Sequence, residues 1–273
     1  MLRILTEKDR KAVEEYLERN QIETTFLIGN VKYFGFENKK DVRRCGDYFG
    51  YFEEGKLKGI IPFYNLGSCI PHYESQNAVP YFIDLMKNRE FKYLLGMRRI
   101  VEPLYDGIKK FKQNASVDED AYFINTNLRE FKLSEIQIKN YYEFDFERAV
   151  EFVVEANRIG FKNTGYTRIE AEKTLSQRPV EEDYLFVLKD GKVVATGCIQ
   201  TTTDKIGQIG GVYTTPNERG KGYCRAVVSE LCKRIIERGK TPTLMVRKNN
   251  TPAVRAYEFL GFEYYDEYLI IEF

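Results

Sequence analysis

The chain has 273 residues, of which 43% are hydrophobic and 30% are charged, so its composition is that of a globular protein and not of a disordered one. This length allows one large domain or two domains of ordinary size. The 42 basic and 41 acidic residues nearly cancel. Nucleic-acid-binding domains usually carry a basic surplus or a basic stripe, and neither is present, so we expect no nucleic-acid partner.

Cysteine and histidine usage gives no sign of a metal site. The single histidine is His72, and no cysteines have the spacing of zinc ligands. The five scattered cysteines are Cys45, Cys69, Cys198, Cys224 and Cys232. We expect them to be reduced thiols in a cytoplasmic protein without a metal. No apolar run could span a bilayer, and the N-terminus lacks the pattern of a signal peptide, so no membrane partner is expected either.

The first half of the chain alternates strand and helix signals. We predict, in order, a strand over residues 2–6, a helix that Thr6 caps, a helix over 24–34, a hairpin over 47–52 and 57–64, a helix over 79–87, a strand over 93–96, a helix over 98–111 and a strand over 121–128. None of the turns between them is glycine-rich. The segment from Gly96 to Arg99 is a weak candidate for anion binding, and His72 is a weak candidate for a catalytic base.

The second half restarts the hydrophobic pattern near residues 131–140. We predict helices over 146–159 and 167–177, a hairpin over 184–188 and 193–200, a strand over 206–214, a helix over 222–238, a strand over 243–247, a helix over 251–259 and a strand over 264–273. The predicted fold class is α/β, with a mixed and largely antiparallel twisted sheet that helices flank.

A glycine-punctuated turn joins the strand at 206–214 to the helix that follows. It reads Arg219-Gly220-Lys221-Gly222-Tyr223-Cys224. Glycines let the backbone approach a ligand closely, and the free N–H groups and positive dipole end of a helix attract an anion. The turn therefore predicts a phosphate-binding site.

Two common phosphate motifs do not fit this turn. A P-loop requires G-x-x-x-x-G-K-[ST], whereas Thr215 stands in place of the first glycine and Gly222 follows Lys221. The dinucleotide fingerprint requires a third glycine, whereas Arg225 occupies that position.

The turn instead resembles the acyl-CoA pyrophosphate loop of the GNAT acetyltransferase superfamily, whose pattern is Arg/Gln-x-x-Gly-x-Gly/Ala. Cys224 departs from the pattern at its last position but is still small. Downstream, the stretch from Asn250 to Phe262 is similar to the family's Asn-x-x-Ala-x-x-x-Tyr-x-x-x-Gly-Phe, with Tyr257 at the tyrosine position. The resemblance covers about residues 137–273.

The resemblance implies a site for acetyl-CoA as co-substrate. The diphosphate would lie on the loop, and the pantetheine arm would pair with the strand edge at Val212, Tyr213 and Thr214. Asn250 would hydrogen-bond the arm, and Tyr257 would protonate the leaving thiolate, for which a phenol has a suitable pKa. The cofactor-binding residues implied are Val212, Tyr213, Thr214, Arg219, Gly220, Lys221, Gly222, Tyr223, Cys224 and Asn250. On the residues alone, the glycines could merely shape a turn, and Tyr257 could be a packed aromatic.

The resemblance implies an N-acetyltransferase that acts on a small-molecule or protein amine by direct attack. The general base is open between a water relay, Glu155 and Glu181. A non-catalytic acyl-CoA-binding or sensing protein is the alternative, and aminoacyl transfer from tRNA is disfavoured by the neutral charge and the intact loop. The sequence leaves the acceptor and the oligomeric state open.

The first half repeats the broad order of elements of the second half but lacks the phosphate turn. We therefore predict two tandem copies of the GNAT fold: a degenerate copy at residues 1–133 and an acyl-CoA-binding copy at residues 134–273.

Overall fold

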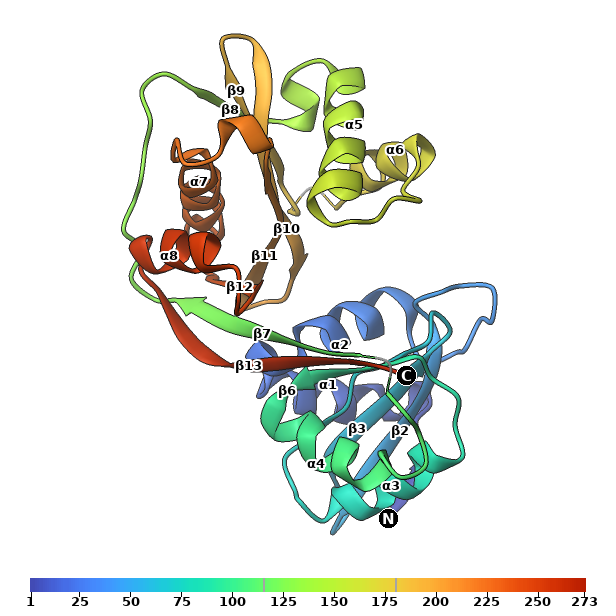
Figure 1. The fold of residues 1–273 in the computed structure, drawn as a ribbon. Helices are drawn as coiled ribbons and strands as arrows, with labels where there is room; N and C mark the ends of the chain where they lie inside the picture. Colours follow the sequence, from blue (N-terminus) through green and yellow to red (C-terminus); the bar gives the residue numbers. More distant parts are fainter. Residues whose placement is uncertain (115, 180) are drawn as a thin grey trace. The chain divides into compact units, whose positions relative to one another are not determined.

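The computed structural model describes residues 1–114, 116–179 and 181–273, which divide into two compact units (Figure 1). The first unit comprises residues 1–122, 246–249 and 265–273. The second unit comprises residues 123–245 and 250–264. The first unit is therefore discontinuous in sequence, because the end of the chain returns to it.

The first unit combines a sheet with two pairs of helices. Its elements are β1 (Leu2–Ile4), a 3-10 turn (Glu7–Asp9), α1 (Arg10–Glu18), α2 (Gln21–Phe34), β2 (Gly46–Glu53), β3 (Lys56–Tyr64), β4 (Ser68–Cys69), β5 (His72–Tyr73), α3 (Ala78–Lys87), β6 (Tyr93–Met97), α4 (Arg98–Ile108) and parts of β7 (Ser116–Asn125) and β13 (Phe262–Glu272). The strands lie in the order β1-β2-β3-β4-β6-β13-β7, and β5 pairs with β3.

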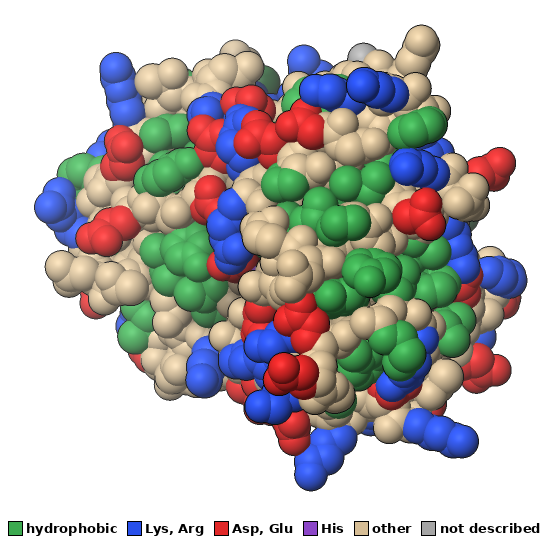
Figure 2. Space-filling model, turned by 90° about the horizontal axis from the view of Figure 1, so that it is seen from below, with side chains coloured by type: hydrophobic (Ala, Val, Ile, Leu, Met, Phe, Trp, Pro, Cys, Tyr) green, Lys and Arg blue, Asp and Glu red, His purple; other side chains and the backbone are tan. Residues whose placement is uncertain are grey.

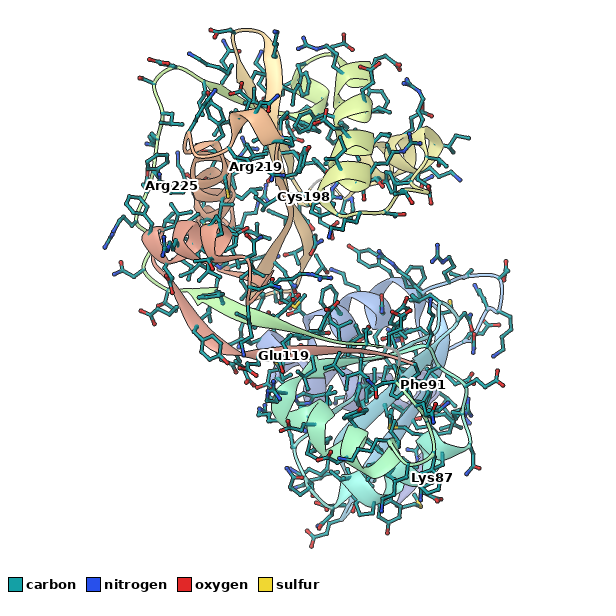
Figure 3. All side chains as sticks on the ribbon, viewed as in Figure 1. Lys87, Phe91, Glu119, Cys198, Arg219 and Arg225 are labelled. Carbon is teal, nitrogen blue, oxygen red and sulfur yellow. The ribbon has the colours of Figure 1, made fainter. Side chains whose placement is uncertain are left out.

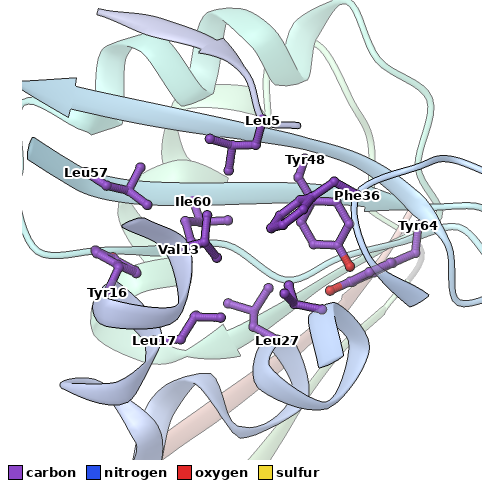
Figure 4. Packing of buried hydrophobic residues seen from close by; sticks show 11 residues of the cluster. Leu5, Val13, Tyr16, Leu17, Leu27, Phe36, Tyr48, Leu57, Ile60 and Tyr64 are labelled. Atoms are coloured by element: carbon purple, nitrogen blue, oxygen red, sulfur yellow. The ribbon is translucent and has the colours of Figure 1, made fainter. Parts of the chain in front are cut away.

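Helices cover both faces of this sheet. Ile60 of β3 belongs to a buried cluster that includes Val13 and Tyr16 of α1 (Figure 4). The neighbouring Gly59 lies on the other face, where a Cβ atom would be 3.0 Å from the Phe82 ring of α3. Because successive residues of a strand face opposite sides, α1 and α3 pack against opposite faces of the sheet. A strand buried on both faces reads as a nearly continuous apolar run, as the end of β3 does.

The last strand of the chain completes this sheet. β13 pairs antiparallel with β6, from Tyr268 opposite Met97 to Glu272 opposite Tyr93. Leu269 is 3% exposed and Ile271 is fully buried. The apolar residues of β13 are therefore part of the core of the first unit.

The second unit contains the elements expected around the phosphate turn. They are the end of β7, β8 (Gln137–Asn140), a 3-10 turn (Tyr141–Glu143), α5 (Phe146–Glu155), a π-helical turn (Ala156–Gly160), α6 (Arg168–Ser176), β9 (Tyr184–Lys189), β10 (Lys192–Thr202), β11 (Ile206–Thr214), a 3-10 turn (Pro216–Glu218), α7 (Tyr223–Glu237), β12 (Thr241–Arg247), α8 (Thr251–Phe259) and the start of β13. The strand order is β12-β11-β10-β9-β8, and only the β12–β11 pair is parallel.

α5 and α7 lie on opposite faces of this second sheet (Figure 1). Phe186 of β9 and Tyr213 of β11 pack into a buried cluster with α5 and α6. On the other face, a Cβ atom at Gly197 of β10 would be 3.1 Å from Leu231 of α7. The predicted fold class, a mixed and largely antiparallel sheet that helices flank, is confirmed.

The units differ from the predicted ranges 1–133 and 134–273. Residues 123–133 group with the second unit, and residues 246–249 and 265–273 group with the first. The physical reason is the pairing of β13 with β6, which draws the C-terminus into the first unit. Smaller differences concern the short strands β4, β5 and β8, which were not expected, and the helix predicted to reach residue 159, which ends at residue 155 and continues as a π-helical turn.

Three further findings concern the described ranges of the chain. They contain no helix long and apolar enough to cross a membrane and no cluster of three His, Cys, Asp or Glu side chains placed to hold a metal ion. All five cysteines are free thiols, four of them buried. On the face shown in Figure 2, basic and acidic side chains are interspersed, and neither sign dominates.

Candidate functional site

β11 carries a bulge just before its predicted ligand-binding edge. Gly210 lies opposite Cys198 of β10 and Tyr213 lies opposite Thr196, so Gly211 and Val212 together face a single residue of β10. Gly211 has a φ of +61°, in the left-handed region that favours glycine. A bulge of this kind bends the strand and takes peptide groups out of the ladder.

β11 and β12 separate after this point. Their parallel pairing runs from Ile206 opposite Thr241 to Ile209 opposite Leu244, and no further pair follows within the described residues. The edge of β11 from Gly210 onward is therefore open on the side of β12. The Thr214 hydroxyl is buried there without a hydrogen-bond partner in the described part of the chain. An open strand edge of this kind can pair with an extended ligand.

The predicted phosphate loop follows directly and ends at the N-cap of α7. Gly220 has a φ of +79° and Gly222 a φ of +88°, both in the left-handed region. A Cβ atom at Gly220 would have no atom within 4 Å, so the backbone there borders open space. The first N–H groups of α7, from Tyr223 onward, have no acceptor within the helix and lie at its positive end. These features suit a diphosphate.

The charged residues of the loop are partly engaged with the loop itself. Arg219 donates from Nε to the carbonyl oxygen of Thr214 at 3.2 Å, and so joins the loop to the end of β11. Lys221 pairs with Glu218 at 2.9 Å. Figure 3 shows Arg219 at the N-terminal end of α7. The Arg219 contact is structural, and its remaining guanidinium donors face no described acidic partner.

The two sequence motifs meet at the start of α7. The Tyr257 hydroxyl lies against the Cys224 thiol, and the Tyr257 side chain is 5% exposed. Burial, together with Cys224, raises the pKa of Tyr257 well above 10, and burial raises the pKa of Cys224 to about 11. Asn250 is the N-cap residue of α8, but its side chain does not cap the helix, which leaves the amide available to a ligand. Tyr257 is thus both a packed aromatic and a protonated phenol beside the loop.

Of the two carboxylates considered as a general base, only Glu155 lies near the end of β11. Its carboxylate accepts hydrogen bonds from the Tyr213 hydroxyl at 3.0 Å and from Thr215 Oγ1 at 3.4 Å. Burial and the Glu155 contact raise the pKa of Tyr213 to about 12. Glu155 also borders an open pocket of about 260 Å³, whose other lining residues are Arg148, Glu151, Phe152, Lys192 and Val193.

Glu181 lies at the opposite end of α7. Its backbone carbonyl accepts a hydrogen bond from Arg238, which follows the last residue of that helix. A helix of 15 residues is about 22 Å long at its usual rise, so Glu181 is far from the loop at the N-terminus of α7. The structure therefore favours Glu155 over Glu181.

The two weak candidates in the first unit have other partners. Arg98 is paired with Glu102 and Glu119 at 2.8 and 2.6 Å, and the guanidinium of Arg99 is paired with Glu23. Both guanidinium groups already have carboxylate partners, which counts against an anion site here. His72 is 2% exposed and is enclosed by the Tyr16 hydroxyl at Nδ1 and by Glu23 at Nε2. It is a buried residue with two side-chain partners and is not accessible to a substrate.

Comparisons with known proteins agree with this geometry. Residues 186–271 match the family model described as FR47-like protein. Among solved structures, a GNAT-family acetyltransferase from Colwellia psychrerythraea has a TM-score of 0.60 at 16% identity and covers 100% of this chain and 99% of its own. A GCN5-related N-acetyltransferase from Sphaerobacter thermophilus has a TM-score of 0.61 at 16% identity, with 99% and 94% covered. The chain has the GNAT fold.

A solved tandem GNAT protein from the clavulanic acid biosynthesis pathway extends the likeness to both units. Its TM-score is 0.59 at 10% identity, and the match covers 99% of this chain and 97% of that one. No curated protein sequence matches the chain. The predicted resemblance to the GNAT superfamily, with a second copy in the first half, is confirmed at the level of the fold.

Within the GNAT fold of the second unit, the predicted residues converge on the end of β11 and the start of α7. Val212, Tyr213 and Thr214 form the open edge, residues 219–224 form the loop and the first turn of α7, and Tyr257 reaches that turn from α8. Sequence reasoning missed a group of aromatic and arginine side chains that lies beside Gly222. A Cβ atom at Gly222 would be 3.1 Å from the Phe131 ring, so residue 131 contacts the loop although it is 91 residues away in sequence.

Proposed function

We propose that the second unit binds acetyl-CoA and transfers its acetyl group to an amine. The observation that carries the proposal is the junction of three features: the open, bulged edge of β11, the left-handed glycine loop and the buried Tyr257 hydroxyl. Each suits a different part of one ligand, namely an extended amide arm, a diphosphate and a thioester. The GNAT fold, which solved acetyltransferases share, supports the same assignment.

The residues present fit the diphosphate and the arm. Gly220 leaves open space where any other residue would place a Cβ atom, and the first N–H groups of α7 are free to donate. The buried Thr214 hydroxyl has no hydrogen-bond partner among the described residues, and the Asn250 side chain does not cap α8, so both can hydrogen-bond the arm.

The reaction would be direct attack of a neutral amine on the thioester carbonyl. A C–N bond forms, the C–S bond breaks, and the amine loses one proton while the departing sulfur gains one. Tyr257, whose pKa is raised well above 10, holds a proton at neutral pH and can give it to the sulfur. Glu155 can take the proton from the amine, because it borders the open pocket near the end of β11.

Acetyl-CoA binding and turnover test this proposal separately. Titration calorimetry with the full chain measures binding of acetyl-CoA, and release of free thiol in the presence of a panel of polyamines, aromatic amines, aminoglycosides and peptides measures transfer. We expect binding and thiol release with at least one acceptor class, and slower release by Tyr257→Phe. Failure to bind acetyl-CoA would overturn the proposal.

A second candidate function is a non-reactive acyl-CoA sensor. The observation in its favour is that the Tyr257 hydroxyl contacts Cys224 and is almost fully buried. Tight acetyl-CoA binding without thiol release for any acceptor would favour this function over transfer.

A further inference from the structure

A group of aromatic and arginine side chains lies beside the N-terminus of α7. It consists of Arg129 and Phe131 from the linker at residues 126–136, Arg225 from α7 and Phe259 from α8, and is called the Arg–Phe cluster below. The Arg225 guanidinium lies 4.7 Å from the ring centroids of both Phe131 and Phe259. The Arg129 guanidinium lies 5.5 Å from the Phe259 centroid, and the two rings meet edge to face at 5.8 Å. All four residues belong to the second unit.

The linker is fixed in this position by hydrogen bonds to both helices. The Phe131 N–H donates to Oγ of the buried Ser229 in α7 at 2.9 Å. The Arg129 N–H donates to the Leu260 carbonyl at the end of α8 at 2.9 Å, and this carbonyl also accepts from the Asn125 side chain. The cluster is therefore held by its backbone and not only by contacts between exposed side chains.

The two guanidinium groups of the cluster are not neutralised. Within the ranges that the structure describes, neither Arg129 nor Arg225 has a carboxylate partner or a side-chain hydrogen bond. By contrast, Arg234 and Arg238 of the same unit are both paired with the carboxylate of Asp183. Stacking on an aromatic ring fixes the guanidinium plane and leaves its N–H donors directed outward, which suits a planar fork for an anion.

The cluster lies next to the proposed diphosphate site. The Phe131 ring is 3.1 Å from the position of a Cβ atom at Gly222, the N-cap of α7, and Arg225 is the third residue of that helix. Figure 3 shows Arg225 between α7 and the linker. A ligand whose diphosphate lies on the loop and whose thioester lies near Tyr257 must extend its other end away from β11. In coenzyme A that end is an adenosine that carries a phosphomonoester on its 3′ oxygen.

We propose that the Arg–Phe cluster binds the 3′-phosphorylated nucleoside end of the acyl donor, with Arg225 and Arg129 holding the 3′-phosphate. The inference rests on the proposed function, because it assumes that the diphosphate lies on the loop. It adds to that function a specificity: the protein distinguishes coenzyme A from dephospho-coenzyme A. The linker, which lies outside the loop motif, thereby contributes to donor selection.

Calorimetry with coenzyme A and dephospho-coenzyme A on the full chain tests the inference. We expect the wild type to bind coenzyme A at least about tenfold more tightly, as two charge-assisted contacts to a dianion predict. Arg225→Gln and Arg129→Gln should each lower this ratio, and the double variant should bring it close to one. Affinity for dephospho-coenzyme A should stay nearly constant, which also reports that each variant is folded.

Arg255→Gln is the matched control, because Arg255 is an exposed arginine of α8 outside the cluster. It should leave the ratio unchanged. Arg225→Lys keeps the charge but not the planar fork and should give an intermediate ratio. Equal affinity of the wild type for both ligands, or an unchanged ratio in the double variant, would overturn the inference while leaving the proposed function intact. If the wild type binds neither ligand, the proposed function itself fails, and the inference fails with it.

Discussion

Replacing Gly222 by alanine tests how the phosphate loop is held in shape. Gly222 has a φ of +88°, and its new Cβ atom would lie 3.1 and 3.2 Å from two carbons of the Phe131 ring. Gly220 provides the matched control within the same loop. Its φ is +79°, yet a Cβ atom there would meet nothing within 4 Å. The two substitutions share the backbone conformation and differ in the contact with Phe131.

The expected losses of stability follow from two costs, the left-handed backbone conformation and the crowding against Phe131. Holding an L-residue in the left-handed region costs about 1–2 kcal/mol at either position. Alanine at residue 222 adds crowding against a ring whose backbone is fixed by Ser229, which we put at about 1–2 kcal/mol from the cost of overpacking. We therefore expect Gly220→Ala to lower the free energy of unfolding by about 1–2 kcal/mol and Gly222→Ala by about 2–4 kcal/mol.

Urea unfolding of the full chain, followed by circular dichroism, measures this difference. The double variant Gly222→Ala/Phe131→Ala should lose less stability than the sum of its single variants, because removal of the ring relieves the crowding. Both glycine variants should also bind coenzyme A more weakly, since the loop must change its backbone conformation to relax. Equal losses for the two alanine variants, or strict additivity in the double variant, would refute the packing argument.

Three further substitutions test the chemistry and the first unit. Tyr257→Phe should lower kcat by about 10²-fold with little change in the KM for acetyl-CoA. Wild-type activity should show no loss from tyrosine ionisation below pH 10, because the pKa of Tyr257 is raised above that value. Steady-state kinetics with the acceptor found by thiol release measure both effects, and a raised KM at unchanged kcat would contradict the acid role. Glu155→Gln should lower kcat/KM by about 10²-fold, and an unchanged kcat/KM would exclude Glu155 as the base. Burial alone would raise the pKa of Glu23, but hydrogen bonds from His72 and Arg99 outweigh it and lower this pKa from 4.5 to about 2. The stability contributed by Glu23, roughly 3 kcal/mol, should therefore be present above pH 4.5 and be lost as the pH falls toward 2. Urea unfolding from pH 2 to 6 should show a shallower acid dependence for Glu23→Gln, and an unchanged dependence would count against a stabilising role of these contacts.

Local sequence signals predicted most elements because their causes are local. The hairpin of β9 and β10 follows from two β-rich runs around the Asp190–Gly191 turn, and both turn residues have positive φ angles. The partner of β13 could not be predicted in this way. β6 lies about 170 residues earlier in the chain, and the apolar pattern of β13 shows only that it is buried, not against which strand.

The same distinction applies to the candidate site. The loop and the positions of Asn250 and Tyr257 could be predicted from the sequence, because a left-handed turn requires glycine and because the second motif has a fixed spacing. The contact between Tyr257 and Cys224 could not be predicted from the sequence, since it depends on how α8 packs against α7. The Arg–Phe cluster was missed because the linker has no periodic pattern, and a polar stretch between strands reads as an ordinary loop.

The chain segments before and after α8 belong to the first unit, whereas α8 itself belongs to the second. Asn250 and Tyr257 lie at the start of α8 and within it. Residues 246–249, just before this stretch, and residues 265–273, after it, belong to the first unit. Lys248 is paired there with Glu119 at 3.2 Å, and β13 is paired with β6. A chain cut at the predicted boundary of residues 133 and 134 would leave the buried Leu269 and Ile271 of β13 exposed on an unpaired strand, which favours aggregation. We therefore expect residues 134–273 expressed alone to aggregate, because their C-terminal strand belongs to the sheet of the first unit.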